Sequence, residues 1–219
     1  EIATEYFVEG GNNRIIIGTD GDFNVGPTSQ MEIIELIEKK RDAGIFLTVL
    51  GVGRGNLNDA MLEQLANNGN GTYEYIDKVA QLEKIFIHDF SKFYTVAKDV
   101  KVQIKFNPKS VESYRLIGYE NRVMNNEDFK DDTKDAGEIG ANQNITALYE
   151  IIPKQNLGAD SQMFTVDFRY KKPNENVSQP MSLTISNSSK TFLKSSENMI
   201  FTGSVAAFSM LLMDSKYKG

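Results

Sequence analysis

The sequence predicts an α/β part followed by a β part, with a partial doubly wound, Rossmann-like parallel half-sheet of about three strands and then an antiparallel β domain with a buried C-terminal helix. Two observations predict this fold class. Up to about residue 98, short continuous apolar runs alternate with amphipathic helices, which is typical of buried parallel strands. From about residue 99, apolar and polar residues alternate strictly, which is typical of strands with one face in water. We therefore expect two domains, 1–98 and 99–219.

The first domain reads as strand and helix repeated three times, after a short helical tail in residues 1–9. This order implies right-handed crossovers and a parallel sheet. Thr28-Ser29 is a candidate helix cap, and basic residues precede Gly44, as expected near the end of a helix. The expected strands are 14–18, 45–50 and 72–76, and the expected helices are about 29–43, 58–67 and 78–96.

The second domain begins with a strictly alternating strand over 100–106. Further strands are expected at 114–119, 145–152, 165–170 and 181–185. Residues 199–213 carry no charge but are fewer than the ~20 that a bilayer span needs. We expect a core helix at about 196–213, buried between other elements, and no direct membrane span.

Composition excludes some classes of function. The chain has 219 residues, a net charge of -6 and no visible Lys/Arg cluster, which argues against a nucleic-acid partner. It has no Cys, so neither a disulfide framework nor a thiolate metal site can form, and both a secreted and a cytosolic origin remain open. No targeting signal is visible, and the missing initiator Met suggests a processed or truncated product.

Polar residues follow the first strand directly. The sequence Ile15-Ile-Ile-Gly-Thr-Asp-Gly-Asp-Phe-Asn24 runs from a buried strand into a turn rich in carboxylates and glycine. In open α/β sheets, ligands bind just beyond the carboxyl ends of the strands. The candidate binding residues are therefore Thr19, Asp20, Gly21, Asp22 and Asn24.

An enzyme hypothesis starts from the same turn. Asp20-Gly-Asp22 after a strand resembles the opening motif of haloacid dehalogenase-type phosphatases, in which one Asp attacks phosphorus and the second acts as acid/base. That family also needs a later Lys and an acidic pair at the end of another strand. The acidic pair here, Asp131-Asp132, follows Phe129-Lys130 and not a buried run. The phosphatase using Asp20 and Asp22 is kept as the alternative function.

Three further signals have simpler explanations. Gly51-Val-Gly-Arg-Gly55 invites a dinucleotide interpretation, but Asn56 stands where the fingerprint wants Gly, and a tight turn explains the glycines equally well. His88 is the single histidine and falls inside an expected helix, so it cannot anchor a triad or a zinc site and is interpreted as a surface residue. The acid-rich stretch 125–138 does not have EF-hand spacing; we interpret it as a solvated loop and assign it no metal.

Ile15–Gly21, with Asn24 three residues on, resembles the fourth-strand motif of von Willebrand factor type A domains. Over about 12–219, the chain resembles a bacterial YfbK-like family, in which such a domain is joined to a C-terminal domain of unknown function. The segments that carry this resemblance are 47–53, 55–59, 65–71, 75–77, 95–101, 114–122, 135–140, 146–150 and 204–212.

The resemblance implies a divalent cation at the top edge of the sheet. Type A domains hold it with an Asp-x-Ser-x-Ser motif after the first strand, a Thr from a later loop and the Asp of the fourth-strand motif. Only Asp20 has a counterpart here, and no Asp-x-Ser-x-Ser occurs in the sequence. The chain thus resembles the C-terminal half of the domain. We expect no cofactor in this chain, with Asp20 a ligand of Mg²⁺ or Mn²⁺ only in the intact parent protein.

The function that the resemblance implies is a non-enzymatic protein-binding or scaffold module. It would be a fragment of a metal-dependent adhesion-like protein of the bacterial cell envelope, periplasmic or extracellular. The expected partner is a protein that offers an acidic group. The sequence leaves the oligomeric state open.

Overall fold

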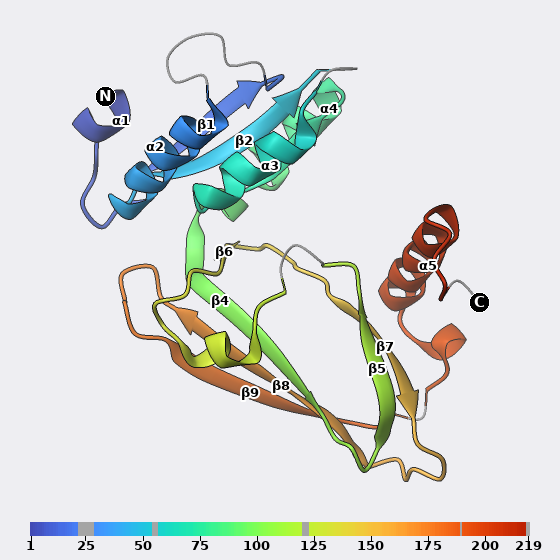
Figure 1. Cartoon of the computed structure of the whole chain (residues 1–219). Coiled ribbons are helices and arrows are strands. Elements are labelled where there is room, and N and C mark those ends of the chain that lie inside the picture. Colours follow the sequence, from blue (N-terminus) through green and yellow to red (C-terminus); the bar gives the residue numbers. More distant parts are fainter. Residues whose placement is uncertain (22–28, 54–56, 120–122, 189, 218–219) are drawn as a thin grey trace. The chain divides into compact units, whose positions relative to one another are not determined.

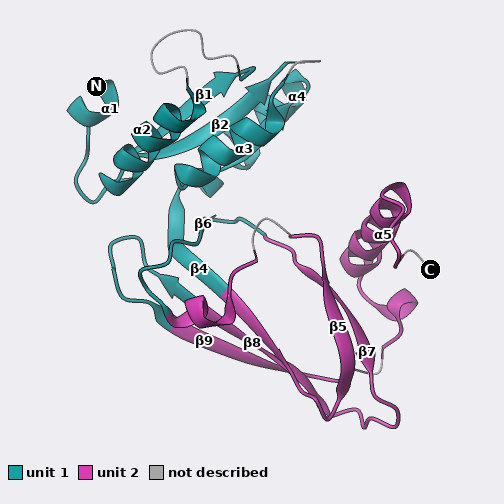
Figure 2. Cartoon of the chain, in the orientation of Figure 1, with its two compact units in different colours: residues 1–101, 131–144, 169–179 teal, residues 102–130, 145–168, 180–219 magenta. Residues whose placement is uncertain are grey.

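The computed structural model describes residues 1–21, 29–53, 57–119, 123–188 and 190–217. The chain forms two compact units, coloured separately in Figure 2. Unit 1 consists of residues 1–101, 131–144 and 169–179, and unit 2 of residues 102–130, 145–168 and 180–219. Unit 1 thus joins the predicted first domain to short segments of the second.

Unit 1 contains the predicted parallel half-sheet. Strands β1 (Arg14–Thr19), β2 (Phe46–Val52) and β3 (Tyr73–Ile76) pair in parallel in the order β1-β2-β3 (Figure 1). The prediction of three parallel strands is therefore confirmed. The predicted strands 100–106 and 165–170 belong to a different sheet.

Helices α1 (Ile2–Glu5), α2 (Gln30–Asp42) and α3 (Asp59–Asn68) belong to the same unit. Two of them begin at polar caps, since Ser29 Oγ accepts a hydrogen bond from the Glu32 amide and Asn58 Oδ1 accepts one from the Met61 amide, each at 3.2 Å.

Two apolar clusters form the core around the half-sheet. Successive residues of a strand point to opposite faces, so Val49 joins one cluster and Leu50 the other. The first cluster also contains residues of α2 and α3, and its buried members are Ile33, Val49, Leu62, Leu65 and Ala66. The second cluster consists of Leu50, Ile76, Ile85 and Phe93.

The prediction of one long helix over 78–96 is wrong. The chain forms α4 (Val79–Glu83), one π-helical turn (Lys84–His88) and a 3₁₀ turn (Phe90–Phe93), and then enters a strand at Thr95. Phe86, Phe90 and Phe93 pack on one another with ring centroids 5.6–6.4 Å apart. His88 is exposed, as predicted.

The remaining strands form the predicted antiparallel sheets. Strands β4 (Thr95–Phe106), β6 (Gly137–Gly140), β8 (Gln162–Lys171) and β9 (Gln179–Ser186) make one sheet in the order β6-β4-β8-β9. Strand β5 (Val111–Ile117) pairs with β7 (Leu148–Pro153). In unit 2, the Phe106 ring stacks on Tyr114 at 3.8 Å. Short 3₁₀ turns cover Asn126–Lys130 and Phe192–Lys194.

Helix α5 (Glu197–Leu212) forms where it was predicted, with Ser196 Oγ accepting a hydrogen bond from the Met199 amide at 3.3 Å. The expectation that it is buried is wrong, because none of its residues is buried and Phe201 is 71% exposed. A helix with apolar residues all around its axis needs cover on more than one side. The described part of unit 2 covers one side only. Within the described residues, no helix is both long and apolar enough to cross a membrane.

Candidate functional site

The turn after β1 is the site that the sequence predicted. The Gly21 amide donates a hydrogen bond to Thr19 Oγ1 at 3.0 Å, and its φ of +95° is a conformation that favours glycine. Asp20 is exposed and lies beside Gly53 at the end of β2, where an added Cβ would come within 3.5 Å of the Asp20 Cβ. Asn58, the cap of α3, lies against Gly21. The structure thus gathers Thr19, Asp20 and Gly21 at one edge of the half-sheet.

The other two predicted site residues, Asp22 and Asn24, lie outside the described residues. Mg²⁺ demands near-octahedral oxygen coordination. Within the part of the chain that the structure describes, no group of three His, Cys, Asp or Glu side chains lies together at this edge.

We expect no tight binding of Mg²⁺ or Mn²⁺ at Asp20 in this chain, because one carboxylate leaves most coordination positions to water and competes poorly with the hydrated ion. Calorimetric titration of the chain and of Asp20→Ala tests this. The two titrations should be the same, since any weak binding elsewhere is common to both. Micromolar binding that is lost only in Asp20→Ala would contradict the prediction.

One residue of the acidic pair considered for the phosphatase hypothesis lies in a polar cleft of unit 1. Asp132 lines this cleft and Asp20 does not. Ser178 Oγ donates to Asp132 Oδ1 at 2.5 Å and Arg169 Nη2 lies 3.0 Å from the same oxygen, and these bonds lower the pKa of Asp132. This carboxylate is therefore held as part of an internal ion pair.

Packing explains the first glycine of the predicted Gly51–Gly55 turn. A Cβ added at Gly51 would lie 2.5 Å from the Tyr73 hydroxyl oxygen, so the side chain of β3 needs a glycine on β2. Gly55 and Asn56 lie outside the described residues. The close approach of Tyr73 accounts for Gly51 without a dinucleotide.

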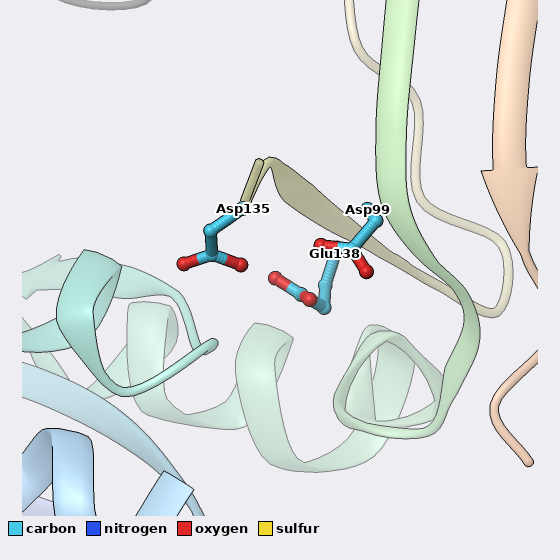
Figure 3. A group of neighbouring side chains, drawn as sticks. All are labelled: Asp99, Asp135 and Glu138. Carbon is cyan, nitrogen blue, oxygen red and sulfur yellow. The ribbon is translucent and has the colours of Figure 1, made fainter. Parts of the chain in front are cut away.

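A second constellation was not predicted. The polar cleft of unit 1 has a volume of about 860 Å³, and three of the carboxyl groups that line it lie close together: Asp99 of β4, Asp135, and Glu138 of β6. One oxygen of each lies within 4.8 Å of the others, and Figure 3 shows the three side chains together. We call these three residues the carboxylate cluster.

Donors from several elements satisfy the carboxylate cluster. Lys171 Nζ lies 2.7 Å from Asp99 Oδ2, and Arg41 Nη1 lies 3.3 Å from Asp135 Oδ2. Asn70 Nδ2 donates to Glu138 Oε1 at 2.8 Å. Because cations of the chain already balance the carboxylates, the cluster is explained without a metal. It connects the α2–β3 region to β4 and β6 inside unit 1.

Burial raises the pKa of Glu138 to about 8, and the negative charges of Asp135 and Asp99 add to this effect. Burial likewise raises the pKa of Asp135, while Arg41 acts in the opposite direction. Glu138 is therefore mostly protonated at neutral pH, which reduces the repulsion between three neighbouring carboxyl groups.

The interpretation of 125–138 as a solvated loop is wrong for its C-terminal part, which supplies Asp132, Asp135 and Glu138 to unit 1. The alternation of apolar residues does not indicate this contact. It places Lys101 on the face opposite Val100 and Val102, yet in the structure Lys101 is 2% exposed and Val102 is 52% exposed. Buried cations require anionic or carbonyl partners, and the acid-rich stretch supplies the carbonyl groups that Lys101 and Lys171 contact.

Comparison with known proteins gives one curated relative and a solved structure. The relative is the "Uncharacterized protein YfbK" of Escherichia coli strain K12, which is 39% identical over 233 residues. The alignment covers 98% of this chain and 40% of the relative, so the chain spans about 40% of the relative's length. The structure is a von Willebrand factor type A protein from Catenulispora acidiphila, with 18% identity and a TM-score of 0.40 over 90% of this chain and 46% of that chain.

A family model described as "Uncharacterized protein YfbK, C-terminal" matches residues 91–219. This match extends from the 3₁₀ turn before β4 through both antiparallel sheets and α5. Since it covers more than half of the chain, the chain belongs to the YfbK C-terminal family.

Proposed function

We propose that this chain is part of a non-enzymatic protein-binding or scaffold protein of the bacterial cell envelope, and that the edge at Asp20 lies in the surface that contacts a partner protein. The observation that carries the proposal is the geometry of this edge. Asp20 is exposed directly after a parallel strand, between Gly21 and Gly53, so that no bulky side chain of either residue covers it.

The likeness of Ile15–Gly21 to the fourth-strand motif of type A domains supports this assignment, because that motif lies at the edge where such domains bind their partners. In the intact protein, a divalent cation here would need ligands from outside the described chain. The compartment rests on family resemblance alone. A non-enzymatic role is supported by the ion pair of Asp132 with Arg169, which engages one of the acidic groups that the phosphatase alternative would use.

The test uses the full-length protein that contains this chain, immobilised and exposed to cell-envelope extract with Mg²⁺ or with a chelator. We expect Mg²⁺-dependent capture of a protein, weakened about tenfold or more by Asp20→Ala. Asp160→Ala is the matched control, because Asp160 is also an exposed loop carboxylate but lies in unit 2.

If the amount of captured protein is changed neither by the chelator nor by Asp20→Ala, the proposal is overturned. Hydrolysis of a generic phosphate ester that is abolished by Asp20→Asn would instead favour the phosphatase alternative. The two outcomes are distinguishable because only the second requires turnover.

A further inference from the structure

Helix α5 has one side that contacts its own unit. Gly203 lies against the Phe192 ring, where an added Cβ would come within 2.6 Å of a ring carbon. Met210 Sδ accepts a hydrogen bond from Arg115 Nη2 of β5 at 3.3 Å. Gly203 and Met210 are seven residues apart, which is about two helical turns, so they lie on the same side. We call this the inner side of α5.

The opposite side carries a row of large apolar side chains. Phe201 and Val205 each lie two residues from Gly203, and Phe208 and Leu212 each lie two residues from Met210. Two residues are somewhat more than half a turn, so all four face away from the inner side. They are 71%, 48%, 60% and 72% exposed, respectively. We call these four residues the outer row.

The outer row is a large exposed apolar patch. The rings of Phe201 and Phe208 alone expose roughly 250 Å², taking about 200 Å² for each aromatic side chain. With Val205 and Leu212 the row exposes roughly 450 Å², which is within the range of about 300–600 Å² of the largest patch on a typical monomer, and such patches are often functional. A standard interface takes about 800 Å² from each partner, so the row supplies about half of that area.

We propose that α5 pairs with α5 of a second copy of this chain in an antiparallel arrangement. The spacing of the outer row is four, three and four residues, which is the spacing of a coiled-coil seam. This spacing also reads the same in both directions. A two-fold axis between residues 206 and 207 places Phe201 against Leu212 of the second copy and Val205 against Phe208 of the second copy. The surface is therefore complementary to itself, as a two-fold interface requires.

The charges at the two ends of α5 select the antiparallel orientation. Lys194 and Glu197 lie at its start, and Asp214 and Lys216 follow its end. Antiparallel pairing brings Glu197 toward Lys216 of the second copy and Lys194 toward Asp214 of the second copy. Parallel pairing would bring each charge toward the same charge of the second copy and would align the two helix dipoles. Between Glu197 and Asp214 the helix carries no charge that would oppose burial.

Sedimentation velocity of this chain over a range of concentrations tests the pairing. We expect a monomer–dimer equilibrium whose dissociation constant rises about tenfold or more in Leu212→Lys. Leu183→Lys on β9 is the matched control, since it makes the same exchange at a residue that is 56% exposed outside α5, and it should leave the equilibrium unchanged. A chain that stays monomeric at a concentration of about 100 µM would overturn the proposal, because that concentration is far above a micromolar dissociation constant.

The orientation is tested by disulfide cross-linking, which is clean because the chain has no native cysteine. Phe201→Cys and Leu212→Cys should each cross-link poorly alone, because the identical positions of an antiparallel pair lie roughly 16 Å apart along the axis. A mixture of the two should cross-link, because the positions then face each other within the ~7 Å that a disulfide allows between Cα atoms. If Phe201→Cys alone cross-links efficiently, and the mixture of the two variants gives no additional cross-linked product, the antiparallel arrangement is overturned.

Discussion

Gly71→Ala is expected to destabilise unit 1 by more than about 4 kcal/mol or to prevent it from folding. A Cβ at residue 71 would lie 1.7 Å from the carbonyl oxygen of Leu47 and 2.5 Å from its carbonyl carbon. Both atoms are backbone atoms of β2, so no side chain can turn aside to make room.

The backbone around Gly71 is also fixed by hydrogen bonds. The Leu47 amide donates to the Gly69 carbonyl at 2.8 Å, and the Val49 amide donates to the Thr72 carbonyl at 3.0 Å. Moving residue 71 away from β2 would break the bonds that hold the end of α3 and the start of β3 against it. Each of these groups would then be a buried donor or acceptor without its partner.

Gly18→Ala is the matched control for this prediction. Gly18 lies in β1 of the same sheet, has an ordinary φ and has no atom within 4 Å of an added Cβ. The same substitution should therefore change the free energy of unfolding by less than about 1 kcal/mol. Any change should be stabilising, because alanine reduces the conformational entropy of the unfolded chain. Urea denaturation followed by circular dichroism measures both variants. Equal effects of the two exchanges would refute the backbone-contact argument.

The half-sheet could be predicted because its signals are local. Three consecutive isoleucines at 15–17 bounded by turn residues, a cap at Ser29 and a helix beginning near Asn58 are each contained in a few residues, and each is found in the structure. The broken helix after β3 could not be predicted in this way. Its apolar residues have helical spacing throughout, so their periodicity does not show where the α-helix ends and the π-helical and 3₁₀ turns begin.

The two sites differ in the same respect. The edge at Asp20 was predicted from one strand and the general rule for parallel sheets, and as a binding site it stays a prediction. The carboxylate cluster joins residues far apart in sequence, and the order of strands β6-β4-β8-β9 brings them together. Periodicity states which face of a strand is buried but not which strand lies beside it. The exposure of α5 was missed for a similar reason, because an uncharged helix does not reveal what covers it.

Glu138→Gln is expected to remove a large pH dependence from the stability of unit 1. The pKa of Glu138 is about 8 in the folded chain, compared with an ordinary value of 4.5, so the folded state holds a proton that the unfolded state has lost. Stability is therefore greatest below pH 4.5 for this group and falls as the pH rises toward 8. At roughly 1.4 kcal/mol for each step of one in pH, the loss reaches on the order of 3–5 kcal/mol above pH 8.

The surroundings of Glu138 decide whether glutamine can replace it. Asp99 of β4 and Asp135 repel its ionised form, and Arg14 of β1 attracts it. Arg41 of α2 and Lys171 of β8 face the other two carboxylates of the cluster. Glutamine retains an oxygen that can accept the hydrogen bond of Asn70 and cannot ionise, so it keeps the contact and loses the penalty.

Urea denaturation at several pH values between 5 and 9 measures the effect. The variant and the unmodified chain should be nearly equal in stability at pH 5, where Glu138 is protonated in the folded state, and should diverge by several kcal/mol at pH 9, with the variant more stable. Glu83→Gln is the matched control, because Glu83 is exposed at the end of α4 and lies outside the cleft. If Glu138→Gln and Glu83→Gln gave the same slope of stability against pH, ionisation of Glu138 would not be the cause of the pH dependence, and the prediction would be wrong.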